Sequence, residues 1–257
     1  MPHSTRRTPI VFAALLVPAG KFADRLGHKR AFLAGSILFT VASMACGLAP
    51  SAWILIAFRV VQAVGAATLI PSSLALLLRA FPPAKVPFAV AIWGASGAVA
   101  GALGPTLGAV LVEAASWRWV FFINLPIGLF TVIAGRRFLH ESKDETATVP
   151  APLGVALIAL AAGLVSHGVV QSESWGWTDF RTIASIVGGL GVLAVFVAQQ
   201  RSTPAPALNR ELFALRIFSW GNAAPFTLGT AFTAMFFSSS LLLTEIWQFS
   251  ILRAGFA

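Results

Sequence analysis

The sequence has few charged residues for its length. Of its 257 residues only 11% are Asp, Glu, Lys or Arg, whereas 57% are hydrophobic and the mean hydropathy is +0.83. Soluble domains carry about a quarter charged residues and less than half apolar residues. The charges here are too few to cover a globular surface. This scarcity excludes an ordinary soluble protein and indicates an integral membrane protein.

Acidic residues and cysteine are scarcer still. Nine Asp and Glu stand against eighteen Lys and Arg, a formal net charge of +9. A basic soluble protein suggests nucleic-acid binding, but that needs a solvated basic face, which this composition cannot build. The excess positive charge is better explained as a topology signal. The single cysteine, Cys46, lies in an apolar run and excludes a disulfide framework or a cysteine-based metal site.

Long apolar runs recur with short polar breaks between them. Seven runs hold roughly 18 or more residues each, enough for a helix to cross a hydrocarbon core about 30 Å thick. Membrane-spanning strands would show alternation over segments of about ten residues, which is absent. We therefore expect an all-α integral membrane protein with spans at residues 31–49, 53–80, 86–112, 118–135, 152–170, 180–199 and 219–243.

The first apolar stretch, Ile10–Gly20, is too short to span a membrane. Its eleven residues would rise only about 16 Å as a helix. A charged loop starts directly at Lys21, without the cleavage site of a signal peptide. Arg6 and Arg7 would also precede a span on its outer side, against the usual charge bias. We expect the second half of a span whose beginning is missing.

The loop charges alternate along the chain. Twelve of the eighteen Lys and Arg fall in alternate connections, and the opposite connections hold three. Lys and Arg are enriched in cytoplasmic loops. We therefore expect a multi-pass protein of the cell membrane whose cytoplasmic loops are residues 21–30, 79–87, 136–151 and 200–217.

A charged loop with two glycines follows the first apolar stretch. Glycines permit a tight reversal of the chain. Asp24 is placed near the start of the next helix, where the helix dipole favours a carboxylate. The alternative is a charged turn that only anchors two helices. The candidate gating loop comprises Gly20, Asp24, Arg25, Gly27, Lys29 and Arg30.

Arg59 lies about seven residues inside the predicted span 53–80. A guanidinium there costs roughly 2.5–3.5 kcal/mol on insertion scales. Gln62 shares its helical face, and Gly65 keeps that face open. We expect a buried polar site that lines a cavity. The alternative is an arginine that reaches back to the outer interface.

The predicted span 86–112 is rich in glycine. Small residues four apart allow two membrane helices to approach closely, and Pro105 favours a kink because it removes a backbone hydrogen bond. We expect a helix whose bend and close packing matter; a plain packing element is the alternative. The small-residue pairs are Gly97 with Gly101 and Gly104 with Gly108.

Two further titratable residues are weaker candidates for a proton site. Glu113 lies near the outer end of the glycine-rich span and either binds a proton there or serves as an interfacial anchor. His167, near the end of another span, either relays a proton or faces a neighbouring helix. The sequence shows no metal-ligand spacing, nucleophile–base pair or phosphate loop. We expect no enzyme, metal site or cofactor.

Together these motifs resemble the major facilitator superfamily, in particular its 14-span drug:proton antiporter branch. The loop motif of that family, G-x3-D-R-x-G-R-K, is matched from Gly20 to Lys29, with His28 in place of a basic residue. Its fourth-helix motif, R-x2-Q-G-x-G, is matched by Arg59, Gln62 and Gly65, with Ala63 replacing a glycine. Its fifth-helix motif, G-P-x2-G-G, is matched by Gly104, Pro105 and Gly108, with Ala109 last.

The resemblance implies a major-facilitator-type helix bundle that is incomplete, with seven full spans plus one half span. Such proteins rock two six-helix bundles about a site at the midplane. The implied regions are residues 1–135 as a partial amino-terminal bundle, 136–217 as a cytoplasmic linker plus two central extra spans, and 218–257 as the truncated first helix of the carboxyl-terminal bundle.

The resemblance also implies a function, a proton-coupled secondary transporter that exports small amphipathic or cationic compounds. Asp24 and Arg25 would latch the cytoplasmic gate, Arg59 would tune proton binding, and the Gly97–Gly108 groove would allow closure. The proton gradient would supply the energy. The expected partners are the lipid bilayer and a small-molecule substrate, not nucleic acid, and missing helices or a second chain would complete the bundle. The alternatives are a transport-incompetent remnant, from a disrupted gene or wrong start, and a solute importer of the same superfamily.

Overall fold

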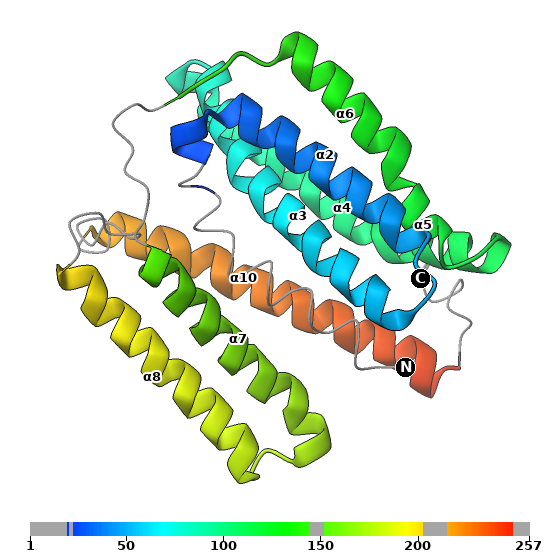
Figure 1. Ribbon diagram of the computed structural model, residues 1–257, viewed down its shortest axis with the longest axis vertical. Helices are drawn as coiled ribbons and strands as arrows, with labels where there is room; N and C mark the ends of the chain where they lie inside the picture. The colour runs from blue at the N-terminus through cyan, green and yellow to red at the C-terminus, as the bar shows by residue number, and fades with distance from the viewer. Residues whose placement is uncertain (1–19, 21–22, 144–151, 203–214, 249–257) are drawn as a thin grey trace. The chain divides into compact units, whose positions relative to one another are not determined.

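The computed structural model describes residues 20, 23–143, 152–202 and 215–248, and no strand occurs within these ranges (Figure 1). The elements are α2 (His28–Gly47), α3 (Ala52–Ala80), η1 (Pro83–Lys85), α4 (Val86–Ala114), α5 (Trp119–Phe122), α6 (Asn124–Phe138), α7 (Pro152–Trp175), α8 (Phe180–Ser202), α10 (Arg216–Leu241) and η2 (Leu242–Ile246).

Six helical segments in the described part of the chain are long and apolar enough to cross a membrane. They coincide with the first six predicted full spans, which are thereby confirmed as helices of spanning length. The seventh prediction, residues 219–243, overlaps α10, a helix of 26 residues. It is not among those six segments. The predicted half span Ile10–Gly20 lies outside the described residues except for Gly20.

The predicted span 118–135 differs from expectation in one respect. It is not one uninterrupted helix, because α5 ends at Phe122 and α6 begins at Asn124, with Ile123 between them. Pro126 gives a physical reason. Its ring nitrogen carries no hydrogen, so the carbonyl of Phe122, four residues earlier, receives no helical hydrogen bond from it.

Helix α2 has helical neighbours on two sides. It packs against α3 on one side and against α5 and α6 on the other (Figure 1). In the apolar 18-residue stretch of α2, 39% of residues are buried, compared with 6% in the corresponding stretch of the segment that contains α4. Most large apolar side chains of these helices are exposed, as expected for helices that face lipid.

Glycine allows α2 and α3 to meet backbone to backbone. A Cβ atom added at Gly65 of α3 would lie 2.7 Å from the amide nitrogen of Phe39 and 3.0 Å from the carbonyl oxygen of Gly35, both on α2. Real Cβ atoms do not approach other atoms that closely. This contact follows the small-residue packing of membrane helices, and it occurs on the Arg59-bearing helix.

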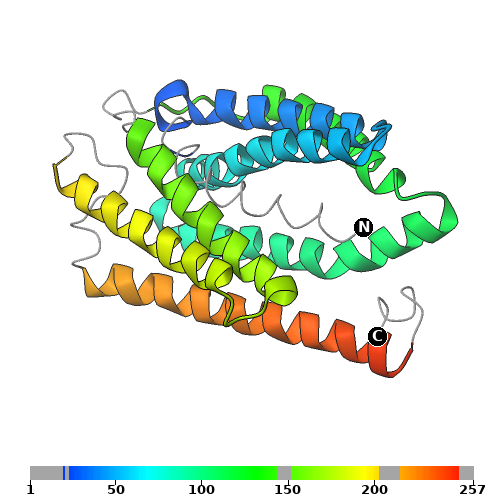
Figure 2. The ribbon, with the colours of Figure 1, turned by 60° about the horizontal axis from the view of Figure 1, so that its bottom comes forward.

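Helices α7 and α8 form an antiparallel hairpin, side by side in both ribbon views (Figures 1 and 2). The chain reverses at Gly176, whose φ of 95° is one that glycine adopts without strain. The hydroxyl of Thr182 donates to the Gly176 carbonyl at 3.0 Å and closes the turn. A Cβ atom at Gly189 would lie 2.9 Å from the amide nitrogen of Val165, so this pair also packs through a glycine.

The described residues fall into two compact units. One consists of residues 20, 23–95, 118–143 and 152–202, and the other of residues 96–117 and 215–248. The polar clusters described next belong to the first unit.

Candidate functional site

Helix α2 begins without a cap from its own neighbourhood. The residue before it, Gly27, has no side chain and a φ of 103°, and the first turn of α2 carries no acidic residue. The first amide groups of a helix need acceptors from outside the helix. The positive end of the helix dipole also favours a negative charge there. Gly27 and the first turn of α2 supply neither.

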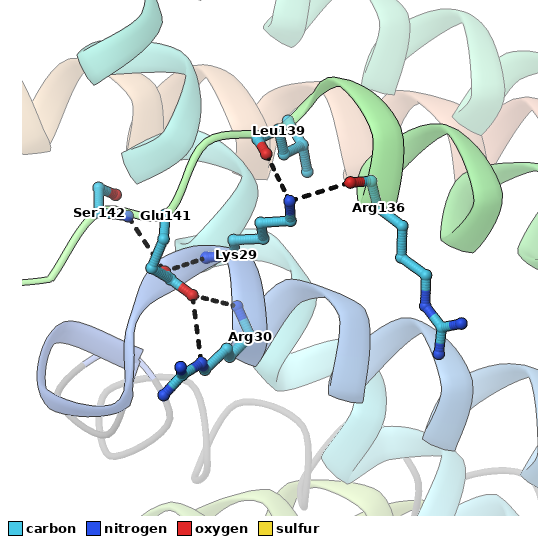
Figure 3. A network of polar contacts seen from close by, with 6 residues as sticks. All are labelled: Lys29, Arg30, Arg136, Leu139, Glu141 and Ser142. Atoms are coloured by element: carbon cyan, nitrogen blue, oxygen red, sulfur yellow. Dashed lines mark hydrogen bonds and ion pairs between the residues drawn. The ribbon is translucent and has the colours of Figure 1, made fainter.

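Glu141, in the segment that follows α6, supplies both the hydrogen-bond acceptors and the negative charge for the start of α2 (Figure 3). Its carboxylate accepts hydrogen bonds from the backbone amides of Lys29, at 3.0 Å, and Arg30, at 3.2 Å. The same carboxylate lies 3.7 Å from Nε of the Arg30 guanidinium. It also accepts a hydrogen bond from the backbone amide of Ser142 at 3.1 Å. Glu141 is thus a helix cap that comes from 112 residues away in the chain.

Lys29 makes the reverse contact. Its ammonium group donates to the carbonyl of Arg136 at 3.0 Å and to that of Leu139 at 2.6 Å, at the carboxyl end of α6 (Figure 3). Cations at helix C-termini and anions at N-termini each contribute about 0.3–1 kcal/mol. The start of α2 and the end of α6 therefore cap one another. We call Gly27, Lys29, Arg30, Arg136, Leu139 and Glu141 the capping cluster.

Gly27 is the member of the predicted gating loop on which the capping cluster depends most directly. A Cβ atom there would lie 2.5 Å from Oε1 of Glu141. The φ of 103° also disfavours any residue with a side chain. Only glycine allows the chain to turn at this point and the carboxylate to reach the helix.

The structure places the other members of the predicted gating loop differently. Asp24 lies 3.4 Å from Nε2 of His28, whose side chain is buried, so the residue that departs from the family motif pairs with the motif's acid. Arg25 is exposed, and a Cβ atom added at Gly20 would lie 3.4 Å from Cβ of Pro71. The capping cluster includes Gly27, Lys29 and Arg30 from the predicted set, together with Glu141, which was not predicted from the sequence.

Arg59 lies half-buried in α3 with neutral partners. Its Nη1 donates to Oε1 of Gln62 at 3.0 Å, one turn along the same helix. Its guanidinium carbon also lies 5.6 Å from the centre of the Phe121 ring, on α5. Among the described residues no carboxylate lies within ion-pair distance of Arg59. A fixed positive charge is therefore held inside a spanning helix, and its two partners among the described residues are neutral.

Two polar residues near Arg59 were not singled out from the sequence. Ser43 of α2 donates through its hydroxyl to the carbonyl of Phe121 at 3.0 Å, and Asn124 of α6 donates to the Ser43 hydroxyl oxygen at 3.0 Å. The only signal for them was a lone serine and a lone asparagine within apolar runs. We call Ser43, Arg59, Gln62, Phe121 and Asn124 the arginine cluster.

The glycine-rich helix α4 has an open face. A Cβ atom added at Gly97, Gly101, Gly104 or Gly108 would meet no described atom within 4 Å. Pro105 lies inside α4, as predicted from its position. Other described glycines make close helix contact, such as Gly35 and Gly65 between α2 and α3 and Gly189 between α7 and α8.

The two weaker proton-site candidates lie near helix ends. Glu113 is exposed, one residue before α4 ends. The His167 ring is exposed on α7 and packs edge-to-face against Trp175, with ring centres 5.7 Å apart. Neither belongs to the capping cluster or the arginine cluster.

Comparison with known proteins agrees with the architecture. The family described as Major Facilitator Superfamily matches residues 8–257. The tetracenomycin C resistance and export protein of Streptomyces glaucescens is 31% identical over 247 residues, 96% of this chain and 46% of that protein. The methylenomycin A resistance protein of Bacillus subtilis strain 168 is 32% identical over 96% of this chain and 53% of its own length.

The multidrug export protein EmrB of Haemophilus influenzae is 32% identical over 95% of this chain and 48% of its own length. The chain thus spans about half the length of these curated relatives. The family match covers nearly every residue, and the described helices are of spanning length. The chain belongs to the Major Facilitator Superfamily and is a multi-pass membrane protein.

Proposed function

We propose that this chain forms part of a proton-coupled secondary transporter that exports small amphipathic or cationic compounds. Arg59 carries the proposal. A permanent charge inside a membrane helix costs roughly 2.5–3.5 kcal/mol on insertion scales and usually marks a transport pathway or proton site. Its partners in the structure, Gln62 and Phe121, are neutral, so its charge remains able to act on a proton site.

The direction of transport is inferred from the relatives. The names of three of them refer to export or resistance, for tetracenomycin C, methylenomycin A and multiple drugs. Export of small compounds from the cell explains both kinds of name. The proton gradient is the proposed energy source, and the substrate would bind at the midplane between rocking bundles.

The capping cluster is the proposed scaffold of the cytoplasmic gate. Twelve of the eighteen Lys and Arg fall on the side that carries residues 21–30 and 136–151, which supports a cytoplasmic location for both. Asp24 and Arg25 would act on this scaffold as the latch. The open glycine face of α4 from Gly97 to Gly108 would receive another helix when the gate closes.

The organisation into regions is part of the same proposal. Residues 1–135 would belong to the amino-terminal bundle, residues 136–217 to a linker with two central spans, and residues 218–257 to the carboxyl-terminal bundle. The self-contained contact between α7 and α8 supports the central pair. A complete bundle would require further helices or a second chain.

Transport in membrane vesicles tests the proposal. Inverted vesicles from an efflux-deficient bacterium that makes this chain should accumulate ethidium when a proton gradient is applied, and a protonophore should abolish the accumulation. Arg59→Ala should lower the rate at least about tenfold, the effect of losing one charge interaction of about 1.4 kcal/mol. Arg181→Ala, at the exposed start of α8, is the matched control and should leave the rate unchanged.

Each other result has a distinct meaning. Normal accumulation by the Arg59→Ala variant would contradict the role given to Arg59. Proton-driven uptake into right-side-out vesicles would indicate a solute importer. Absence of movement in both orientations would show that the 257-residue chain is incompetent for transport by itself.

A further inference from the structure

The guanidinium of Arg59 depends on a ring from another element. Gln62 lies on the same helix and accompanies Arg59 wherever α3 goes, but Phe121 belongs to α5, which packs against α2. The 5.6 Å distance between the guanidinium carbon and the ring centre is close to the 6 Å limit of a cation–π contact. A small displacement of α5 would therefore end the contact.

A chain of two hydrogen bonds fixes that element. Asn124 donates to the Ser43 hydroxyl, and the hydroxyl donates in turn to the carbonyl of Phe121, each at 3.0 Å. The Ser43 side chain is fully buried, with 0% of its surface exposed. Buried hydroxyls and amides are held strongly to their partners, because a broken bond leaves a polar group without water. Helices α2, α5 and α6 are joined at this one hydroxyl.

The packing next to Ser43 leaves α5 little freedom. A Cβ atom added at Gly47, one turn further along α2, would lie 2.6 Å from Cε1 of Phe122. The ring of Phe122 also meets that of Trp119 edge-to-face, with centres 5.9 Å apart. The short helix α5 is thus seated closely on α2, and its neighbouring ring, Phe121, is directed toward α3 and Arg59.

We propose that Ser43 and Asn124 are positioning residues for Arg59. They hold the carbonyl of Phe121, and through it the ring that keeps the guanidinium in one orientation. The ring stabilises the cation without neutralising it, so Arg59 keeps its full charge in a defined direction. The tuning of proton binding rests on the proposed function above. The hydrogen-bond chain and the shielding of Arg59 do not.

Chemical modification of arginine tests the positioning independently of transport. The membrane-embedded chain is treated with phenylglyoxal, and peptide mass spectrometry gives the modified fraction of Arg59 relative to Arg181. Ser43→Ala, Asn124→Ala and Phe121→Leu should each raise the modification of Arg59 about fivefold, as expected for loss of one cation–π contact that is still partly accessible to water. Ser43→Thr, which keeps the hydroxyl, should restore the original value.

A control variant separates positioning from general loosening. Thr131 of α6 donates to the carbonyl of Ile127 within its own helix at 2.8 Å. Thr131→Val should leave the modification of Arg59 unchanged. If Phe121→Leu raises the modification but Ser43→Ala and Asn124→Ala do not, the proposal is overturned. The same holds if Thr131→Val raises it as much as they do.

The pH profile of transport completes the test. In the vesicle assay, Asn124→Ala and Phe121→Leu should move the midpoint of proton-driven accumulation to higher pH by about half to one unit, because a displaced cation no longer favours the deprotonated form of the proton site. An unchanged profile in variants whose Arg59 has become reactive would overturn the positioning role. If the unmodified chain moves no ethidium, the proposed function fails, and the modification measurement alone decides the inference.

Discussion

Gly27 and Gly176 share an unusual backbone conformation but differ in their surroundings. Their φ angles are 103° and 95°. A Cβ atom at Gly27 would collide with Glu141, whereas at Gly176 it would meet no described atom within 4 Å. The pair therefore separates two reasons for which a glycine is needed, the backbone angle and the space.

We expect Gly27→Ala to be the more damaging of the two substitutions. Gly176→Ala should lower the free energy of unfolding by about 1–2 kcal/mol, the cost of the left-handed conformation. Gly27→Ala should cost about 1–3 kcal/mol more, since the new methyl group displaces the carboxylate of Glu141. Denaturant unfolding in mixed micelles measures both. Equal losses would contradict the collision, and adding Glu141→Ala to Gly27→Ala should remove the extra cost.

Glu141 and Glu113 lie at opposite kinds of helix end. Glu141 caps the start of α2, whereas Glu113 stands at the carboxyl end of α4. Glu141→Gln should destabilise the protein by about 0.5–1 kcal/mol, and Glu113→Gln should be neutral or slightly stabilising, because a negative charge is favoured only at the amino end. Unfolding in micelles at low and high salt measures both effects. A stabilising Glu141→Gln would contradict the assigned cap.

At the scale of the element, glycines of α3 and α4 that look alike in the sequence have different surroundings. A Cβ atom at Gly65 would meet the backbone of α2 at 2.7 Å, whereas at Gly101 it would meet no described atom within 4 Å. Gly65→Ala should therefore cost about 1–3 kcal/mol through separation of α2 from α3. Gly101→Ala should be neutral or stabilise by up to about 1 kcal/mol through helix propensity. Micelle unfolding would contradict this if both variants lost stability equally.

The ends of the helices were largely predictable, and their partners were not. Hydrophobic length and charge place spans within a few residues, because lipid requires about 20 apolar residues per crossing. The interruption at Ile123 was missed, although Pro126 marks it. Glu141 was missed because its partners on α2 are 111 and 112 residues away, and nothing local distinguishes it from neighbouring acids. Ser43 and Asn124 were missed because an isolated polar residue in a span is common and its bonding partner is set only by packing.

The roles assigned to Asp24, Arg25, Arg59 and the α4 glycines remain predictions at this scale. The structure places Gln62 beside Arg59, which helical spacing indicated, but spacing could not indicate Phe121. A contact between different helices depends on how they are packed. The sequence of one helix does not specify which residues of another helix it will contact.

At the scale of the whole molecule, the predicted topology has a direct test. Helix α7 lies between His140 and Trp177, so the two positions should face opposite sides of the membrane. In a Cys46→Ser background, His140→Cys should react with an impermeant maleimide in inverted vesicles and Trp177→Cys in right-side-out vesicles. Reaction of both from one side would contradict the topology. The native Cys46, 0% exposed, should react from neither side.

The mutual capping of α2 and α6 has a kinetic consequence. The amides of Lys29, Arg30 and Ser142 share a single carboxylate, and the ammonium of Lys29 holds the carbonyls at the end of α6. If the Glu141 carboxylate moves away, all three amides lose their acceptor together. Because Glu141 closely follows α6, separation of α6 from α2 removes the carboxylate from these amides. The two helix ends should therefore fray cooperatively, and in hydrogen exchange these amides should open with one common rate instead of one by one.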